Sequence, residues 1–251
     1  MSHAGCSGGA ILEGHGWSKS LKKRAFDIIV SAIVLASTFA IGAILCIVVR
    51  LTSKGPALFR QKRVGLNGRL FTVYKFRTMV SQNHEGGPGL TRNGDIRLTF
   101  VGRVLRKLKL DEIPQFYNVL RGDMSLVGPR PKLPEYSVAS DWRYRPGITG
   151  LATLAFRHEE EMLRDIPGDE LNAFYDSEIR PRKARLDRRY MRKASFASDS
   201  IIIWKTAAVC LSPKPMRWRA MPSQRSVPLP EPQWAEERGS MAMALETESV
   251  E

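Results

Sequence analysis

The longest hydrophobic feature of the chain is the segment from Ile28 to Val49, which contains no charged residue and is followed by Arg50. A segment of this length can cross a lipid bilayer as a helix. Basic residues flank it on both sides, at 22–24 before it and at 50, 54, 60, 62 and 63 after it. A spanning helix usually carries its basic residues on one side, so this pattern predicts a helix that enters the membrane, bends and returns to the same face. A plain spanning helix is the alternative.

The middle of this segment contains residues that allow a bend. Ser37, Thr38 and Gly42 lie there, and Ser and Thr hydroxyls can hydrogen-bond to the preceding turn and bend a helix. Cleaved signal peptides have shorter apolar cores and a small-residue cleavage site, which argues against a signal peptide.

Shorter periodic segments follow. Ala57–Lys62 and Leu70–Phe76 predict two strands, and Asn67-Gly68 between them predicts a hairpin turn. The Gly- and Asn-rich segment 81–95 predicts a mobile loop. A helix over 99–110 has an apolar stripe and a basic face, which fits an interfacial membrane helix or an ordinary core helix equally well. Further helices are expected at 133–142, 171–179, 182–193 and 198–211, and another that begins at Asp111.

Charge narrows the classes of partner. The chain has 39 Lys and Arg against 25 Asp and Glu, a net charge of +14, which favours an anionic partner: nucleic acid, an anionic membrane face or a small anionic substrate. Nucleic acid is not expected as the partner. The aromatic residues of the chain are not interleaved with a basic strip, and nucleic-acid binding would not explain the apolar segment. The three Cys and four His are scattered, so neither a disulfide framework nor a zinc site is indicated.

The candidate chemistry lies between Leu108 and Pro131. The adjacent carboxylates Asp111 and Glu112 follow a basic run and precede Arg130, which Gly128-Pro129 and Pro131 hold in a restricted backbone. Arginine binds phosphate oxygens with two nitrogens, and Mg²⁺ prefers one or two carboxylates together with substrate phosphates. The pattern therefore indicates handling of phosphate with a divalent metal. The plainer interpretation is a surface helix whose first turn is capped by Asp111.

The same stretch carries a family resemblance. The sequence LDE-x-PQ-x-x-NVL-x-GDMSLVGPRP, followed by RPGITG from Arg145 to Gly150, resembles the bacterial initiating sugar transferases, which are monotopic polyprenyl-phosphate phosphoglycosyl transferases. The resemblance covers roughly Leu21 to Leu211. It implies that a nucleotide-diphosphate sugar, with a UDP-sugar favoured, gives its phosphosugar to polyprenyl (undecaprenyl) phosphate and releases the nucleoside monophosphate. This is the first membrane step of exopolysaccharide or glycoconjugate synthesis.

The resemblance also implies roles for individual residues. Asp111 would form a covalent phosphosugar ester, and Glu112 would hold Mg²⁺. The expected substrate-binding residues are Lys75, Arg77, Arg106, Arg130, Arg145 and Asp187. Lys75 and Arg77 belong to a matching YKFRTM sequence, although a solvated basic strand face is an equal alternative for them. Asp187 matches the family's Asp-x-x-Tyr, and an Asp that only pairs with its Arg neighbours is an equal alternative. Residues 151–161 depart from the commonest family pattern, which suggests a substrate subgroup, and Thr38 stands where the family commonly has proline.

These inferences predict an α+β, mostly helical fold with an N-terminal re-entrant membrane helix, a small β-hairpin and interfacial amphipathic helices. The expected organisation is a flexible tail (1–19), a membrane-inserted helix (20–54), a catalytic domain on the cytosolic face (55–212) and a disordered C-terminal tail (213–251). The expected location is the bacterial inner (cytoplasmic) membrane, in contact with its lipids. A membrane-anchored, non-catalytic scaffold that recruits an anionic partner is the alternative, but it leaves Asp111-Glu112 beside Gly-Pro-Arg-Pro unexplained.

Overall fold

The computed structural model describes residues 16–80, 95, 97–134, 144–163, 166, 167 and 170–211, all within one compact unit that extends from Met1 to Lys214. These residues are mostly helical, as expected, with two small two-stranded sheets. The helices are α1 (Gly16–Lys19), α2 (Leu21–Thr52), α3 (Phe100–Lys107), α4 (Gln115–Arg121), α5 (Leu151–Ala155), α6 (Glu159–Met162), α7 (Leu171–Phe174), α8 (Arg180–Lys193) and α9 (Phe196–Leu211). The strands are β1 (Leu58–Val64), β2 (Leu70–Phe76), β3 (Ser125–Val127) and β4 (Gly147–Thr149). The start of the N-terminal tail, the loop 81–94, most of the helix expected at 133–142 and the C-terminal tail lie outside the described residues.

The long apolar helix is present and is longer than its uncharged segment. Helix α2 runs for 32 residues without a break, from the N-cap Ser20, whose side chain accepts a hydrogen bond from the Lys23 amide, to Thr52. It is long and apolar enough to cross a membrane, and only 6% of its most apolar window is buried in the protein. At the expected bend the hydroxyls of Ser37 and Thr38 donate to the Val34 carbonyl at 3.0 and 2.6 Å. The return of this helix to the same membrane face remains a prediction.

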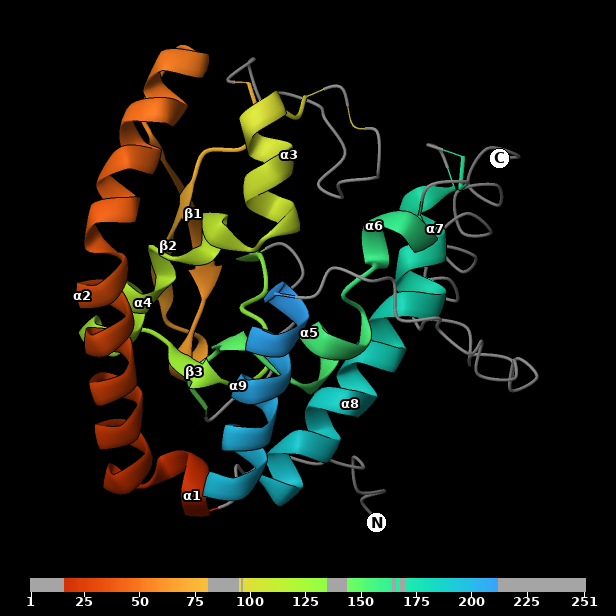
Figure 1. Ribbon diagram of the computed structural model, residues 1–251. Helices are drawn as coiled ribbons and strands as arrows, with labels where there is room; N and C mark the ends of the chain where they lie inside the picture. Colours follow the sequence, from red (N-terminus) through yellow and green to blue (C-terminus); the bar gives the residue numbers. More distant parts are fainter. Residues whose placement is uncertain are drawn as a thin grey trace, which may run out of the picture. The chain divides into compact units, whose positions relative to one another are not determined.

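Buried polar side chains connect the first turns of α2 to the rest of the fold. Lys23 Nζ lies 2.6 Å from Asp199 Oδ2 on α9, and the Tyr190 hydroxyl of α8 donates to Asp199 Oδ1 at 2.7 Å. Ser125 of β3 donates to Asp27 Oδ2 at 2.8 Å. All five side chains are buried, so these charge-assisted bonds fix where α2, α8, α9 and β3 meet. Figure 1 shows α2 in red and orange on one side of the hairpin, with α8 and α9 on the other side.

The hairpin prediction is confirmed. Strands β1 and β2 pair antiparallel from Leu58↔Phe76 to Val64↔Leu70, so β1 extends two residues beyond the expected Lys62. Asn67 and Gly68 in the connection have φ of 54° and 75°, the left-handed region that Asn and Gly tolerate best. Helix α4 packs against β2 on one side and α2 on another.

Two features differ from the sequence-based expectation. Residues 171–193 form one continuous helical run in which α7 leads through a π-helical turn, Tyr175–Ile179, into α8. Pro181 was expected to separate two helices, but it lies in the first turn of α8, after the wide turn, where a proline ring and its missing N–H are tolerated. The parallel pair β3–β4 was not anticipated, because three residues per strand give too little periodicity. A Cβ at Gly147 would collide with the backbone of Gly128, so this close pairing requires glycine.

Candidate active site

The carboxylate pair lies in a tight turn and does not begin a helix. Lys109 has φ of 58°, which ends the path of α3, and Leu110–Glu112 form a single 3₁₀ turn. Helix α4 begins only at Gln115, after Pro114, with no side-chain cap. The expectation that Asp111 caps a helix is therefore wrong. The prediction counted the acidic residues and the proline as a helix start, but the left-handed Lys109 and the 3₁₀ turn place both carboxylates inside the protein, each 7% exposed.

Glu112 is held between two cations from distant parts of the chain. Lys75 Nζ of β2 lies 3.2 Å from Glu112 Oε1, and Arg130 Nη2 lies 2.5 Å from the same oxygen. Burial alone would raise the pKa of Glu112, but the charges of Arg130 and then Lys75 hold it well below its usual value. Glu112 is therefore a carboxylate anion at neutral pH. Burial lowers the pKa of Lys75, an effect that Glu112 opposes.

Asp111 occupies a different electrostatic environment from its neighbour. Burial, and then the negative charge of Glu112, raise the pKa of Asp111 above its ordinary value, while Lys75 acts in the opposite direction. Its Oδ1 atom is fully buried and accepts no hydrogen bond from any described residue. Asp111 thus has one buried oxygen without a hydrogen-bond partner among the described residues, beside a carboxylate whose charge is compensated by Arg130 and Lys75. Adjacent groups whose pKa values are driven apart are typical of active sites.

Arg106 lies near this pair and contacts a region of the chain where no site residue was predicted. Its positive charge is among those that lower the pKa of Asp111, and its Nη2 lies 2.5 Å from Glu160 Oε1 on α6. The neighbouring Glu159 binds Lys183 Nζ with both oxygens at 2.6 Å, and Tyr175 lies 2.9 Å from the same amine. The only sequence signal for these contacts was the acidic run 159–161 within the segment that departs from the family pattern.

Arg77 and Arg145 make their contacts elsewhere. The Arg77 guanidinium donates to the carbonyls of Ser53 and Val49 at 2.7 and 3.2 Å, at the C-terminal end of α2. Arg145 Nε donates to the Gly122 carbonyl at 2.9 Å, at the C-terminal end of α4. Cations at these positions satisfy free carbonyls and interact favourably with the helix dipole. The structure therefore brings Lys75 and Arg130 onto Glu112 but does not bring Arg77 or Arg145 there.

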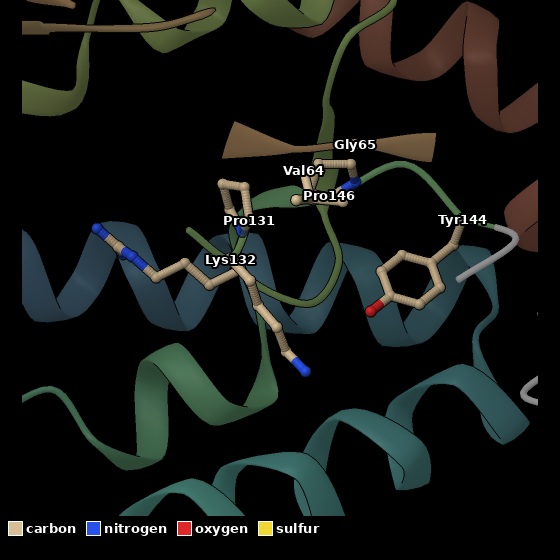
Figure 2. A pocket seen from close by; sticks show the side chains of 7 residues that line it. Val64, Gly65, Pro131, Lys132, Tyr144 and Pro146 are labelled. Carbon is tan, nitrogen blue, oxygen red and sulfur yellow. The ribbon is translucent and has the colours of Figure 1, made fainter. Parts of the chain in front are cut away.

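Asp187 lies close enough to raise the pKa of Lys132 and Tyr144 by its charge, and both of these residues line a pocket together with Arg130. The pocket is lined by Val64, Gly65, Arg130, Pro131, Lys132, Tyr144 and Pro146. Figure 2 shows the Lys132 and Tyr144 side chains on different sides of it. Burial raises the pKa of Asp187 to about 6, and the charges of Lys132 and Lys183 oppose this rise. Arg130 therefore connects the carboxylate pair with the pocket near which Asp187 lies.

The residues fit a magnesium ion that takes few of its ligands from the protein. Both hydrogen bonds to Glu112 within the described residues use Oε1, which leaves Oε2 as the oxygen for a metal. In the same part of the chain no group of three or more His, Cys, Asp or Glu side chains is placed to hold a metal. Mg²⁺ commonly takes one or two carboxylate oxygens and completes its shell with substrate phosphates and water, so it needs no larger group here.

The chain is similar to known proteins. Residues 18–213 match the bacterial sugar transferase family. The chain belongs to this family. The match includes every predicted site residue, from Lys75 to Asp187, and the long apolar helix α2.

Individual relatives carry related names. The chain is 45% identical over 145 residues to the UDP-glucose:undecaprenyl-phosphate glucose-1-phosphate transferase of Caulobacter vibrioides, an alignment that covers 53% of each protein. It is 34% identical over 199 residues to the UDP-N-acetylgalactosamine-undecaprenyl-phosphate N-acetylgalactosaminephosphotransferase of Aeromonas hydrophila (76% of this chain, 44% of that protein). It is 32% identical over 214 residues to the exopolysaccharide production protein ExoY of Sinorhizobium fredii (76% of this chain, 87% of that protein). The chain thus spans about half the length of the first two and most of the third.

Proposed function

We propose that this bacterial sugar transferase moves a phosphosugar from a UDP-sugar to polyprenyl phosphate, and that the reaction passes through a covalent phosphosugar ester of Asp111. The observation that carries the proposal is the unpartnered, buried Oδ1 of Asp111 next to Glu112, whose own charge is neutralised by Lys75 and Arg130. The names of the relatives, which combine UDP-sugars with undecaprenyl phosphate, support the substrate classes.

The chemistry divides into two substitutions at one phosphorus atom. An Asp111 carboxylate oxygen attacks the β-phosphorus, the bond from phosphorus to the α-phosphate oxygen breaks, and the nucleoside monophosphate leaves with that electron pair. A phosphate oxygen of the lipid then attacks the same phosphorus, and the bond to Asp111 breaks to regenerate the carboxylate. Covalent catalysis of this kind replaces one difficult step by two easier ones, and one carboxylate serves both substrates.

The surrounding residues have separate tasks in this scheme. Lys75 and Arg130 face the site from β2 and from the Gly-Pro-Arg-Pro loop, and their charges favour the negative charge that develops on phosphoryl oxygens. Glu112 keeps these two cations in place and would hold Mg²⁺ through Oε2. When bound, the metal would neutralise the diphosphate. Arg106 lies close enough to influence Asp111 and supplies a further cation.

The location follows from the lipid substrate. Its phosphate lies at the height of the lipid headgroups, so the active site has to be held against the membrane. We place the protein at the inner membrane with its catalytic part on the cytoplasmic face and with α2 as the inserted, returning helix. Helix α3 supports this placement, because Phe100, Val104 and Leu108 follow one another at helical spacing and are 76%, 45% and 37% exposed. An exposed apolar stripe with basic neighbours is typical of an interfacial helix.

The test is release of UMP. Membranes from cells that express the chain are mixed with Mg²⁺, undecaprenyl phosphate and UDP-glucose, UDP-galactose or UDP-N-acetylgalactosamine, and membranes from cells without the chain are the control. UMP release that depends on the chain, with sugar phosphate appearing on the lipid, is the expected result. If no nucleotide sugar supports release although the protein is folded and in the membrane, the non-catalytic scaffold becomes the better interpretation.

A further inference from the structure

A second buried polar group without a partner lies one turn after Asp111. Gln115 is the first residue of α4 and is 3% exposed. Its side-chain Nε2 is fully buried and has no hydrogen-bond partner among the described residues. Buried amide donors are nearly always paired, since leaving one unpaired forfeits the hydrogen bond that it would make in water. The Gln115 amide is therefore a donor that is available to a group bound beside it.

The next polar residue on the same buried face shows that this packing can satisfy an amide. Asn118 Nδ2 donates to the Thr72 carbonyl at 2.7 Å, and Asn118 Oδ1 accepts from the Tyr74 amide at 3.2 Å. Asn118 Nδ2 also donates to Asp123 Oδ2 at 3.3 Å, so both ends of this side-chain amide are hydrogen-bonded. Gln115, three residues earlier, has no such bond. The unpaired amide is therefore specific to Gln115 and is not common to the amides on this face of α4.

The position of Gln115 is set by the backbone that links it to Asp111. Ile113 and Pro114 have helical dihedral angles, with φ and ψ of −51° and −42° and of −61° and −17°. The backbone bonds are nevertheless of the 3₁₀ type, since the Ile113 amide donates to the Leu110 carbonyl and the Phe116 amide to the Ile113 carbonyl. Residues three apart share a face in such a turn, so Gln115 follows Glu112 on the buried side, next to Asp111. Asp111 therefore offers an unpaired acceptor and Gln115 an unpaired donor in neighbouring positions, and the two do not bond to each other.

We propose that the Gln115 amide donates a hydrogen bond to a non-bridging oxygen of the phosphoryl group that Asp111 attacks. The inference rests on the proposed function, because it needs a phosphoryl group at Asp111. A neutral donor suits this position, since Lys75 and Arg130 already supply charge through their contacts with Glu112. The bond strengthens as charge develops on the oxygen, so Gln115 acts mainly on the rate of phosphoryl transfer and little on substrate affinity.

The experiment measures the first half-reaction alone. The full chain in lipid nanodiscs is mixed with Mg²⁺ and a UDP-sugar accepted by the wild type, labelled with ³²P in the β-phosphate, without lipid acceptor. The rate of label transfer to protein, the substrate concentration for half-maximal rate and the unfolding midpoint are measured. Gln115→Met keeps the length of the side chain and removes the donor. We expect label transfer to slow about 10²-fold, with half-maximal concentration within about threefold and an unfolding midpoint that does not fall.

Two further variants complete the design. Gln61→Met makes the same chemical change on β1, where the Gln61 side chain accepts bonds from Arg63, and should label at the wild-type rate. Gln115→Glu keeps the shape but places an acceptor toward the phosphoryl oxygen, and should be slower than Gln115→Met. If Gln115→Met does not fold, Gln115→Glu decides the question. Label transfer within about threefold of wild type in a folded Gln115 variant overturns the proposal. Failure of the wild type to take up label overturns the covalent mechanism itself, and with it this role for Gln115.

Discussion

Arg130 and Glu112 form the contact around which the site is built, with Arg130 Nη2 lying 2.5 Å from Glu112 Oε1. The same oxygen receives Lys75, so one carboxylate fixes two cations that come from a loop and from a strand. The neighbouring Asp111 has no such cation on its buried Oδ1 within the described part of the chain, and in the proposed reaction it is the member of the pair that attacks phosphorus. Each of the following predictions tests one consequence.

Asp111→Asn should abolish activity without unfolding the protein. An amide cannot form the phosphosugar ester, so the turnover rate should fall by several orders of magnitude. Asp111 is not a helix cap, and burial disfavours its charge, so the free energy of unfolding should change by no more than about 1 kcal/mol. UMP release and urea unfolding in detergent measure the two effects.

The matched control is Asp176→Asn. Asp176 is 49% exposed and pairs with Arg180 one turn later in the helical run, and exposed pairs of this kind contribute about 0.5 kcal/mol or less. The Asp176→Asn variant should keep wild-type activity. Turnover of Asp111→Asn near the wild-type rate would mean that Asp111 is not the nucleophile.

Removal of Mg²⁺ should stop turnover, and Mg²⁺ should restore it. Turnover should need the metal because Glu112 Oε2 fits an ion that takes its other ligands from the diphosphate. Glu112→Gln weakens this ligand and also releases Lys75 and Arg130, so its activity should be low but should rise partly with Mg²⁺ concentration. Asp111→Asn should show no such rescue. Full turnover of the wild type in excess EDTA would contradict the metal role.

The rate of the first half-reaction should fall on acidification. The pKa of Asp111 is raised, and only its ionised form can attack, so the rate is lost as pH decreases through that raised pKa. Lys75 is the largest influence that lowers this pKa. Lys75→Met should therefore shift the acidic limb to higher pH, in addition to slowing the reaction. A pH–rate profile with an unchanged limb in Lys75→Met would show that Lys75 does not act on Asp111.

Asp187 should make stability depend on pH. Burial raises its pKa to about 6 in the folded protein, whereas an unfolded Asp has a pKa of about 3.9. Between about pH 4 and 6 the folded state keeps a proton that the unfolded state loses, so this group lowers the free energy of unfolding as pH rises, with no further change above about pH 6. In Asp187→Asn this contribution disappears.

The measurement is urea unfolding at several pH values. From pH 4 to 7 the stability of Asp187→Asn relative to wild type should rise, by less than about 3 kcal/mol. The exposed Asp176→Asn should give a difference that does not depend on pH in this way. A constant difference for Asp187→Asn would indicate that Asp187 titrates normally in the folded protein.

Both ends of α2 should lie in the cytoplasm. Single cysteines near Ser18 and at Ser53, in a background without Cys6, Cys46 and Cys210, should resist an impermeant thiol reagent in intact cells and react after lysis. Thr38→Pro should be tolerated, because the helix is expected to bend there. Labelling of one of the two positions from outside would identify α2 as a plain spanning helix.

The sequence alone determined the parts of this protein that depend on local patterns. The uncharged segment 28–49 specified a long apolar helix, Asn67-Gly68 specified the hairpin, and Asp111-Glu112 with Gly-Pro-Arg-Pro pointed to a phosphate site and to the family. Such features are visible because helix and strand periods and turn conformations are set by neighbouring residues.

Tertiary structure decided which charges meet. Arg77 and Arg145 lie in motifs as clear as that of Arg130, yet they contact the ends of helices, while Lys75 and Arg130 converge on Glu112. A side chain's partner depends on which elements pack together and on which carbonyls remain free at their ends, and neither is written in the spacing of residues. For the same reason the buried network of Lys23, Asp27 and Asp199, the β3–β4 pair and the unpaired amide of Gln115 became visible only once the chain was folded.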